Sequence, residues 1–410
     1  MSPTRQSKNS MGTLLVLGAV VILGIIYTLA GSDPFGLFAS PQSATAVPQI
    51  TLSATAEEPV VEATRGASGT WWQVFFVNSQ RISTTDEIKY AGGLPAAMYK
   101  GSITEQLIKH IDAAKKTIHI ASFETDLTDV ANALIRAKGR GVDVRWITDD
   151  DNGIAADTKP GRGQFALMKK AGIPIIDDQR GALMHDKFWL FDGKTVWTGS
   201  TNVTVSAMFE QNNNVIVIDS AALATIYESQ FEDMWSGKFN AKSPSTVANQ
   251  QLTIEGTKIQ ILFSPEDSAI SKIIPYIQGA KKSINFMAFT FTQPDLGQAM
   301  LAAAKNGVAL SGVFEATGAD ASFGQMTPLF CAKIPVRTDG NPAFMHHKVI
   351  VIDNRIVITG SLNFTDNADQ NNNENVIIID NPTIAKLYTA EFQRVWTAGK
   401  EPDPTKLKCK

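Results

Sequence analysis

The sequence contains two copies of one pattern, and this repeat constrains the fold more than any other feature. Residues 113–149 align with residues 279–315 at a constant offset of 166. Residues 184–235 align with residues 345–396 at an offset of 161 and without a gap. Because the match extends through most of each copy, the chain is predicted to contain two homologous halves.

Each copy alternates short apolar runs with amphipathic stretches of helical period. In the first copy, TIHIASF and VDVRWIT are each followed by a helical stretch, near 127–139 and 163–171, and three further apolar runs come after them. Apolar strands that alternate with helices are typical of a sheet covered on both faces. The sequence therefore predicts two α/β sandwich halves, residues 70–248 and 249–400, and a short tail at 401–410.

The N-terminal segment has no charged residue between Lys8 and Asp33, and its apolar run is long enough to cross a bilayer as a helix. Basic residues precede this run, so residues 1–10 are predicted to be cytoplasmic, residues 11–31 to span the membrane and the catalytic part to lie outside the cytoplasm. The alternative is a cleaved secretory signal, which predicts a secreted protein. Residues 32–69 are rich in Ser, Thr, Ala and Pro and are predicted to be a disordered linker.

Charge and cysteine content narrow the partners only slightly. The chain has 37 Lys and Arg against 40 Asp and Glu, a formal net charge of −3. Proteins that grip a long polyanion usually carry an excess of basic residues, so this balance disfavours extended nucleic acid as a substrate. The two cysteines, Cys331 and Cys409, form neither a metal-ligand spacing nor a disulfide framework; a single bridge between them requires an oxidising compartment and is not expected.

Each half contains one dense polar motif with the spacing H-x-K-x4-D-x6-G-S-x-N. Six fixed positions rarely match by chance, and this match occurs at equivalent places in both copies. The motif comprises His185, Lys187, Asp192, Gly199, Ser200 and Asn202 in the first half and His346, Lys348, Asp353, Gly360, Ser361 and Asn363 in the second.

The residue types of this motif suit phosphodiester chemistry. Histidine and lysine are two residues apart, so their side chains point to the same face of a strand. Two such pairs facing each other supply two imidazoles and two ammonium groups, which can stabilise the charge that develops on phosphate oxygens. The Ser and Asn side chains are expected to donate hydrogen bonds, and no metal ion or other cofactor is required. Asp192 and Asp353 precede turns and are predicted to hold backbone amides.

This pattern resembles the phospholipase D superfamily, whose members carry two HKD motifs, and the likeness covers nearly all of residues 71–400. The resemblance implies that the two halves pack with pseudo-two-fold symmetry and bring both motifs into one cleft. It also implies two chemical steps: one histidine attacks phosphorus, and the other protonates the leaving oxygen and then activates water. The implied catalytic residues are His185, Lys187, His346 and Lys348, supported by Asp192, Asp353, Ser200, Asn202, Ser361, Asn363 and Glu374.

The two halves differ at one position that bears on these roles. Glu374, 28 residues after His346, matches the acid that hydrogen-bonds the catalytic imidazole in similar proteins, whereas Asn213 stands at the equivalent position after His185. We infer that His346 is the more activated imidazole. In many members with two motifs the N-terminal histidine is the nucleophile, with Glu210 a candidate for compensation here, so the two roles stay open at this point.

The sequence predicts a membrane-tethered, metal-independent phosphodiesterase that hydrolyses phospholipid headgroups through a phosphohistidine. Its expected partners are a phospholipid or another phosphodiester substrate and, through the N-terminal helix, a membrane; no obligate protein partner is evident. The second half also resembles bacterial nucleases and mitochondrial cardiolipin hydrolases. A non-specific endonuclease acting on nucleic acid and a cardiolipin-synthase-type phosphatidyltransferase are therefore the alternatives.

Overall fold

The computed structural model describes residues 64–79, 93–239, 247–248 and 250–409. The predicted cytoplasmic segment at 1–10 and the predicted span at 11–31 lie outside these residues. Within the described part of the chain, no helix combines the length and the apolar character needed to cross a membrane. This finding contradicts the predicted location as a single-pass membrane protein with an extracytoplasmic catalytic domain, and that location is not retained.

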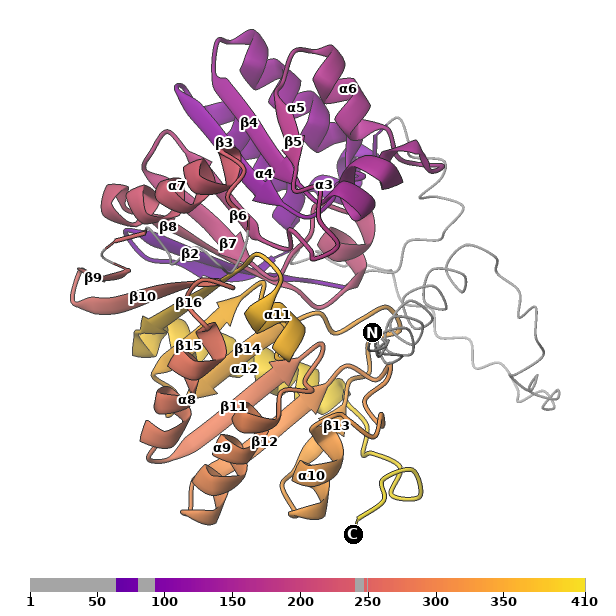
Figure 1. The fold of residues 1–410 in the computed structure, drawn as a ribbon, viewed down its shortest axis with the longest axis vertical. Coiled ribbons are helices and arrows are strands. Elements are labelled where there is room, and N and C mark those ends of the chain that lie inside the picture. The colour runs from indigo at the N-terminus through magenta and orange to yellow at the C-terminus, as the bar shows by residue number, and fades with distance from the viewer. Residues whose placement is uncertain (1–63, 80–92, 240–246, 249, 410) are drawn as a thin grey trace, which may run out of the picture. The chain divides into compact units, whose positions relative to one another are not determined.

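The first half forms one eight-stranded mixed sheet in the order β1-β2-β8-β7-β6-β3-β4-β5 (Figure 1). Strands β3, β4 and β5 run parallel to one another, and the other pairings are antiparallel. The strands are β1 (Thr64–Ser68), β2 (Trp72–Val77), β3 (Thr117–Ser122), β4 (Asp143–Thr148), β5 (Ile175–Asp177), β6 (Lys187–Phe191), β7 (Thr195–Gly199) and β8 (Asn214–Asp219).

The second half repeats this sheet strand for strand, in the order β9-β10-β16-β15-β14-β11-β12-β13. Its strands are β9 (Gln251–Ile254), β10 (Thr257–Ser264), β11 (Ser283–Ala288), β12 (Ala309–Phe314), β13 (Val336–Thr338), β14 (Lys348–Ile352), β15 (Ile356–Gly360) and β16 (Glu374–Asp380). The same topology in both sheets confirms the two homologous α/β halves that the sequence repeat predicts.

Helices pack on both faces of each sheet, as the apolar strands require. The first half has α3 (Ala96–Tyr99), α4 (Ile103–Ala113), α5 (Thr128–Gly139), α6 (Gln164–Lys170) and α7 (Ala221–Trp235), and the second has α8 (Ala269–Gly279), α9 (Pro294–Lys305), α10 (Met326–Cys331), α11 (Asp366–Gln370) and α12 (Pro382–Ala398). Helices α4 and α5 share a core with the outer face of the first sheet, and α8 and α9 share one with the outer face of the second.

A third apolar core joins the two halves. It contains side chains from both sheets together with α7 and α12. Tyr227 of α7 lies edge-to-face between Phe188 of β6, at a ring-centroid distance of 5.1 Å, and Phe263 of β10, at 5.3 Å. All three rings are fully buried. Because this core is continuous from one half to the other, it holds the two halves together.

Two expectations about the ends of the described chain are wrong. Residues 64–68, predicted to end the disordered linker, form β1 and pair with β2; an added edge strand is held by backbone hydrogen bonds and needs no apolar pattern. Cys331 and Cys409 are joined in a disulfide. This bridge attaches the C-terminal tail to the end of α10, and Leu407 of the tail is buried in the second core.

Candidate functional site

Two polar segments cross from one half to the other and hold the motif histidines. In the first half, the segment before β8 reaches the second motif: the His346 N–H donates to the Asn212 carbonyl at 2.9 Å. In the second half, the segment before β16 reaches the first motif: the His185 N–H donates to the Asn373 carbonyl, also at 2.9 Å. Each histidine is thus fixed by backbone of the opposite half.

His185 is paired with a carboxylate of the second half. Its Nδ1 lies 2.8 Å from Oε2 and 2.9 Å from Oε1 of Glu374, and the Glu374 side chain is fully buried. A carboxylate accepts a hydrogen bond from the Nδ1–H, which leaves the lone pair of the neutral ring on Nε2. The inference that Glu374 activates His346 is therefore wrong, because the strand that begins at Glu374 crosses to the other motif.

His346 has only neutral partners at the same ring atom. Its Nδ1 lies 3.0 Å from Oδ1 of Asn213 and 3.1 Å from the backbone oxygen of Ser200. Both oxygens accept hydrogen bonds, so Nδ1 carries the hydrogen and Nε2 the lone pair in this ring too. Asn213 is oriented by its own bonds, since its Nδ2 donates to the Ala207 carbonyl at 3.0 Å. The two imidazoles thus present the same atom in different electrostatic settings.

Each lysine lies beside the histidine of its own motif. Nζ of Lys187 donates to the His185 carbonyl, and Nζ of Lys348 to the His346 carbonyl, both at 2.9 Å. Burial lowers the pKa of Lys187 to about 8, against the opposing effect of Glu374. Burial and the neighbouring Lys187 also lower the pKa of Lys348 well below its usual value. The two lysine side chains, which come from opposite halves, thus influence each other electrostatically.

Burial and the two lysines lower the pKa of both motif histidines well below the usual value. Both rings are therefore neutral at pH 7. Burial raises the pKa of Glu374 to about 8, although Lys187 and Lys348 favour its ionised form. The four residues His185, Lys187, His346 and Lys348 are thus brought together as one electrostatically coupled group from two halves.

An aromatic ring lines each half of the site. Phe123 packs edge-on against His185, with a centroid distance of 5.0 Å, and the Lys187 Nζ lies 5.3 Å from its centroid. Phe289 repeats this arrangement in the second half, 4.6 Å from the His346 ring and 4.6 Å from the Lys348 Nζ. Phe123 and Phe289 pair at the 166-residue offset, so the sequence repeat was sufficient to identify them as equivalent residues of the two halves. Both rings exclude water from one side of the reacting groups and strengthen their electrostatics.

The remaining motif residues support the site in three ways. The buried Ser200 hydroxyl donates to Asn213 Oδ1 at 2.7 Å, and the buried Ser361 hydroxyl accepts from the Asn375 N–H at 2.9 Å, so both serines hold the crossing segments. Nδ2 of Asn202 donates to Glu124 at 2.9 Å. Oδ1 of Asn202 and Oδ1 of Asn363 are buried without a protein partner among the described residues.

The motif aspartates lie away from the histidines. Asp192 accepts the backbone N–H groups of residues 115–117 at 2.6–3.1 Å, and Asp353 accepts those of residues 281–283 at 2.6–2.9 Å. These bonds lower the pKa of both carboxyls. The prediction that they hold backbone amides is confirmed, although the amides belong to the entry into β3 and β11 rather than to the aspartates' own turns.

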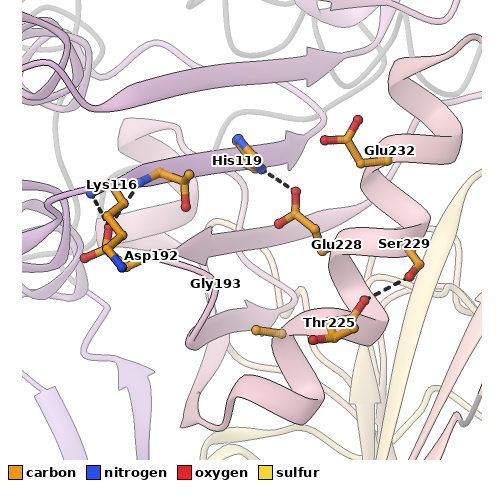
Figure 2. A pocket seen from close by; sticks show the side chains of 10 residues that line it. Lys116, His119, Asp192, Gly193, Thr225, Glu228, Ser229 and Glu232 are labelled. Carbon is orange, nitrogen blue, oxygen red and sulfur yellow. Dashed lines mark hydrogen bonds and ion pairs between the residues drawn. The ribbon is translucent and has the colours of Figure 1, made fainter.

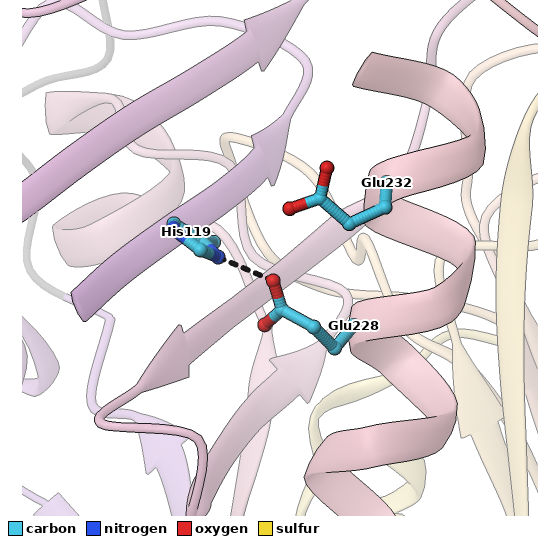
Figure 3. A group of neighbouring side chains, drawn as sticks. All are labelled: His119, Glu228 and Glu232. Atoms are coloured by element: carbon cyan, nitrogen blue, oxygen red, sulfur yellow. Dashed lines mark hydrogen bonds and ion pairs between the residues drawn. The ribbon is translucent and has the colours of Figure 1, made fainter. Parts of the chain in front are cut away.

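A second group of polar residues lies in a surface hollow of about 450 Å³ between β3 and α7 (Figure 2). His119 there faces Glu228 and Glu232 of α7, a set that could ligate a metal ion (Figure 3). However, the Arg145 guanidinium donates to His119 Nε2 at 2.7 Å and forms an ion pair with Glu232 at 2.9 Å. The positive charge of Arg145 thus takes the place that a metal ion would have among these side chains. We interpret the group as a network of polar contacts that holds α7 on the sheet.

Comparisons with known proteins agree with the repeat and with the fold. Residues 107–235 and 273–396, more than half of the chain, match the family model described as "Cardiolipin synthase, PLD-like domain". A solved structure, phosphatidylserine synthase from Haemophilus influenzae Rd KW20, covers 78% of this chain and 93% of its own with a TM-score of 0.59 and 16% identity, a similarity of fold.

Two groups of relatives are similar in sequence. The chain is 38% identical over 130 residues to mitochondrial cardiolipin hydrolase from Xenopus laevis, a match that covers 32% of this chain and 62% of that protein. It is 30% identical over 204 residues to phospholipase D from Rickettsia prowazekii (strain Madrid E), which covers 47% of this chain and 98% of the relative. The match to the hydrolase thus spans less than two thirds of that protein's length.

Proposed function

Because the chain belongs to the family of cardiolipin synthase, PLD-like domains, we propose that it is a metal-independent phosphodiesterase that hydrolyses phospholipid headgroups. The observation that carries this proposal is the meeting of two His–Lys pairs from opposite halves, with Nδ1 of each ring engaged by an acceptor. Such an arrangement supplies a nucleophile, a general acid and two cations without a further group.

In the first step, we assign His185 as the nucleophile. Its Nε2 lone pair attacks phosphorus, an N–P bond forms, and the bond from phosphorus to the leaving oxygen breaks. The ring becomes positively charged as this happens. The positive ring favours the ionised form of Glu374 against burial, and this carboxylate at Nδ1 stabilises the charge. The neutral oxygens of Asn213 and Ser200 stabilise a charged His346 less.

His346 acts as the general acid in this step and as the general base in the next. The negative charge of a bound phosphodiester offsets the two lysines and favours a proton on His346 Nε2. Because its Nδ1 partners are neutral, that proton is readily given to the leaving oxygen. His346 then takes a proton from water, the hydroxide oxygen attacks phosphorus, and the N–P bond breaks to restore His185.

The lysines bind the phosphate oxygens in both steps. Each ammonium is anchored to the backbone at 2.9 Å, so its remaining hydrogens can point at the substrate. A phosphodiester has one negative charge in the ground state, and further charge collects on its non-bridging oxygens in the transition state. Two preorganised cations beside it lower that barrier.

The charges around the site favour a substrate with a single phosphate. Two arginines near the motifs are already paired: Arg162 with Glu124 at 2.7 Å, and Arg180 with Asp178 at 3.1 Å. A nucleic acid would also need cations for its flanking phosphates. The names of the relatives, cardiolipin hydrolase and phospholipase D, point to lipids as well.

The test is a direct comparison of substrates. The full chain is incubated in EDTA with phospholipid in detergent micelles and, separately, with plasmid and single-stranded DNA. We expect release of the lipid headgroup, its loss in His185→Asn and its retention in His110→Asn, a histidine whose Nδ1 lies 2.9 Å from the Gln106 carbonyl of its own helix. Cleavage of DNA without headgroup release would overturn the lipid assignment.

A further inference from the structure

Carboxyl groups outside the motifs hold the peptide that precedes each catalytic histidine. Asp149 follows β4, and its Oδ2 accepts the Met184 N–H at 3.1 Å. Glu315 follows β12, and its Oε2 accepts the Met345 N–H at 2.7 Å. Met184 and Met345 directly precede His185 and His346 in the chain. The same bond is thus made twice, once by an aspartate and once by a glutamate.

Each of these carboxyls has a second carboxyl beside it. Asp178 follows β5 and accepts the Asp150 N–H at 3.2 Å, and Asp339 follows β13 and accepts the Ala316 N–H at 2.8 Å. Strands β4 and β5 are parallel neighbours, as are β12 and β13, so their ends meet at one edge of the sheet. The two dyads, Asp149–Asp178 and Glu315–Asp339, therefore occupy equivalent places in the two halves.

All four carboxyls are buried, with exposed fractions of 1% for Asp149, 6% for Asp178, 4% for Glu315 and 4% for Asp339. A buried carboxyl is costly unless its hydrogen bonds compensate for lost water. Here both oxygens of Asp149 and of Glu315 accept hydrogen bonds, since Asp149 Oδ1 also accepts the Asn152 N–H and Glu315 Oε1 the Thr317 N–H. Both halves thus bury a carboxyl and compensate for its lost hydration with hydrogen bonds. This repetition indicates a role beyond filling the interior.

We propose that Asp149 and Glu315 are positioning residues, which fix the peptide before His185 and His346 and so direct each imidazole at the phosphate. The inference rests on the proposed function, because it assigns a task within that reaction. A shift of about 1 Å in a reacting group can lower a rate about 100-fold, so a bond that fixes the backbone beside the histidine has a direct effect on catalysis.

The charges of the dyads fit the same role. The negative charge of Asp149 raises the pKa of Lys187, and that of Glu315 raises the pKa of Lys348, against burial. Burial and the neighbouring carboxyl raise the pKa of Asp178 to about 7 and that of Glu315 to about 8. In their ionised forms, Asp149 and Glu315 thus favour the protonated form of the lysine in their own half.

The kinetic test uses Asp149→Ala and Glu315→Ala in the full chain, with Asp369→Ala as the matched control. Asp369 is 8% exposed, and its Oδ1 accepts the Ile270 N–H at 2.8 Å, so it is a buried carboxyl with a similar bond to another segment. We expect kcat to fall about 10- to 100-fold in both test variants, with KM changed less than about threefold. The control should lose thermal stability to a similar degree with kcat unchanged.

A second measurement does not depend on activity. It uses amide variants, so it remains informative if an alanine variant folds poorly. In the chain labelled with [15N]histidine, Glu315→Gln should shift the ring resonances of His346 and leave those of His185 in place, and Asp149→Asn should do the reverse. Losses in kcat no larger than the control's, or ring resonances that move in neither variant, would overturn the inference. If the wild type cleaves no phosphodiester, the proposed function fails, and the ring resonances alone decide the positioning role.

Discussion

At the residue level, the partners of the two Nδ1 atoms distinguish two histidines that the motif makes look alike. Glu374 brings a carboxylate to His185, and Asn213 brings a neutral amide to His346. The amide side chain has nearly the same shape as a carboxylate but accepts a hydrogen bond without its charge. This difference between the halves gives a direction to a site whose backbone is pseudo-symmetric.

The asymmetry predicts unequal effects of mutation at these two positions. Glu374→Gln should lower kcat about 100- to 10,000-fold, because the charge on His185 loses its counter-charge and the ring can adopt the wrong tautomer. Asn213→Ala should lower kcat about 10-fold, since the Ser200 carbonyl still accepts from His346 Nδ1. Steady-state headgroup release measures both, with thermal unfolding as the control. Equal losses would contradict the assigned roles.

Loss of the Lys187 proton is expected to set the alkaline limb of the pH profile of kcat/KM. Its lowered pKa of about 8 means that the ammonium is present below that pH and is lost as the pH rises through it. Binding of the phosphodiester should therefore weaken above pH 8. In Lys187→Arg the guanidinium stays protonated, so kcat/KM should decline at a higher pH than in the wild type, whatever its absolute value. Identical alkaline limbs would show that Lys187 does not set this limb.

At the level of elements, the site depends on close contact between strands at the start of each crossing segment. Gly199 ends β7 with φ +156°, and a Cβ there would lie 2.1 Å from the Asn214 oxygen. Gly360 ends β15 with φ +147°, and its Cβ would lie 2.1 Å from the Asn375 oxygen. Only glycine allows the backbone to approach so closely.

Gly360→Ala should therefore disturb the segment that carries Glu374 to His185. We expect a loss of about 3 kcal/mol or more in unfolding free energy, because the backbone must move away from β16. A urea titration measures this loss. Gly307→Ala provides a comparison, since its φ of +89° is also positive but no atom lies within 4 Å of its Cβ. A loss at Gly360 no larger than that at Gly307 would contradict the close-contact account.

The sequence was sufficient to predict the repeat, the α/β halves and the motif, because each rests on local periodicity or fixed spacing. It was not sufficient to predict which histidine Glu374 serves. Counting along the chain relates Glu374 to His346, 28 residues away, but the start of β16 lies at the boundary between halves and places the carboxylate on His185. The sequence did not predict Asp149 and Glu315 as site residues because they lie outside the motif, although they too pair at the 166-residue offset.

For the whole molecule, the Cys331–Cys409 bridge closes a stretch with a sequence separation of 78 residues. Loop-closure entropy gives an upper value of about 4.5 kcal/mol for such a bridge. In Cys409→Ser we expect the tail to detach locally without unfolding of the sheet, with a loss of about 1–2 kcal/mol and kcat unchanged. Trypsin should also cleave after Lys406 faster than in the wild type. Equal cleavage rates would show that the tail is held without the disulfide.

Trapping the covalent intermediate tests the central claim most directly. A phosphodiester with a good leaving group, labelled on phosphorus, needs no proton from His346 to react, so the first step should proceed in His346→Asn while hydrolysis slows. The account predicts that labelled phosphohistidine accumulates at residue 185 in His346→Asn and is absent from His185→Asn. A labelled adduct on His346 in the His185→Asn protein would contradict it.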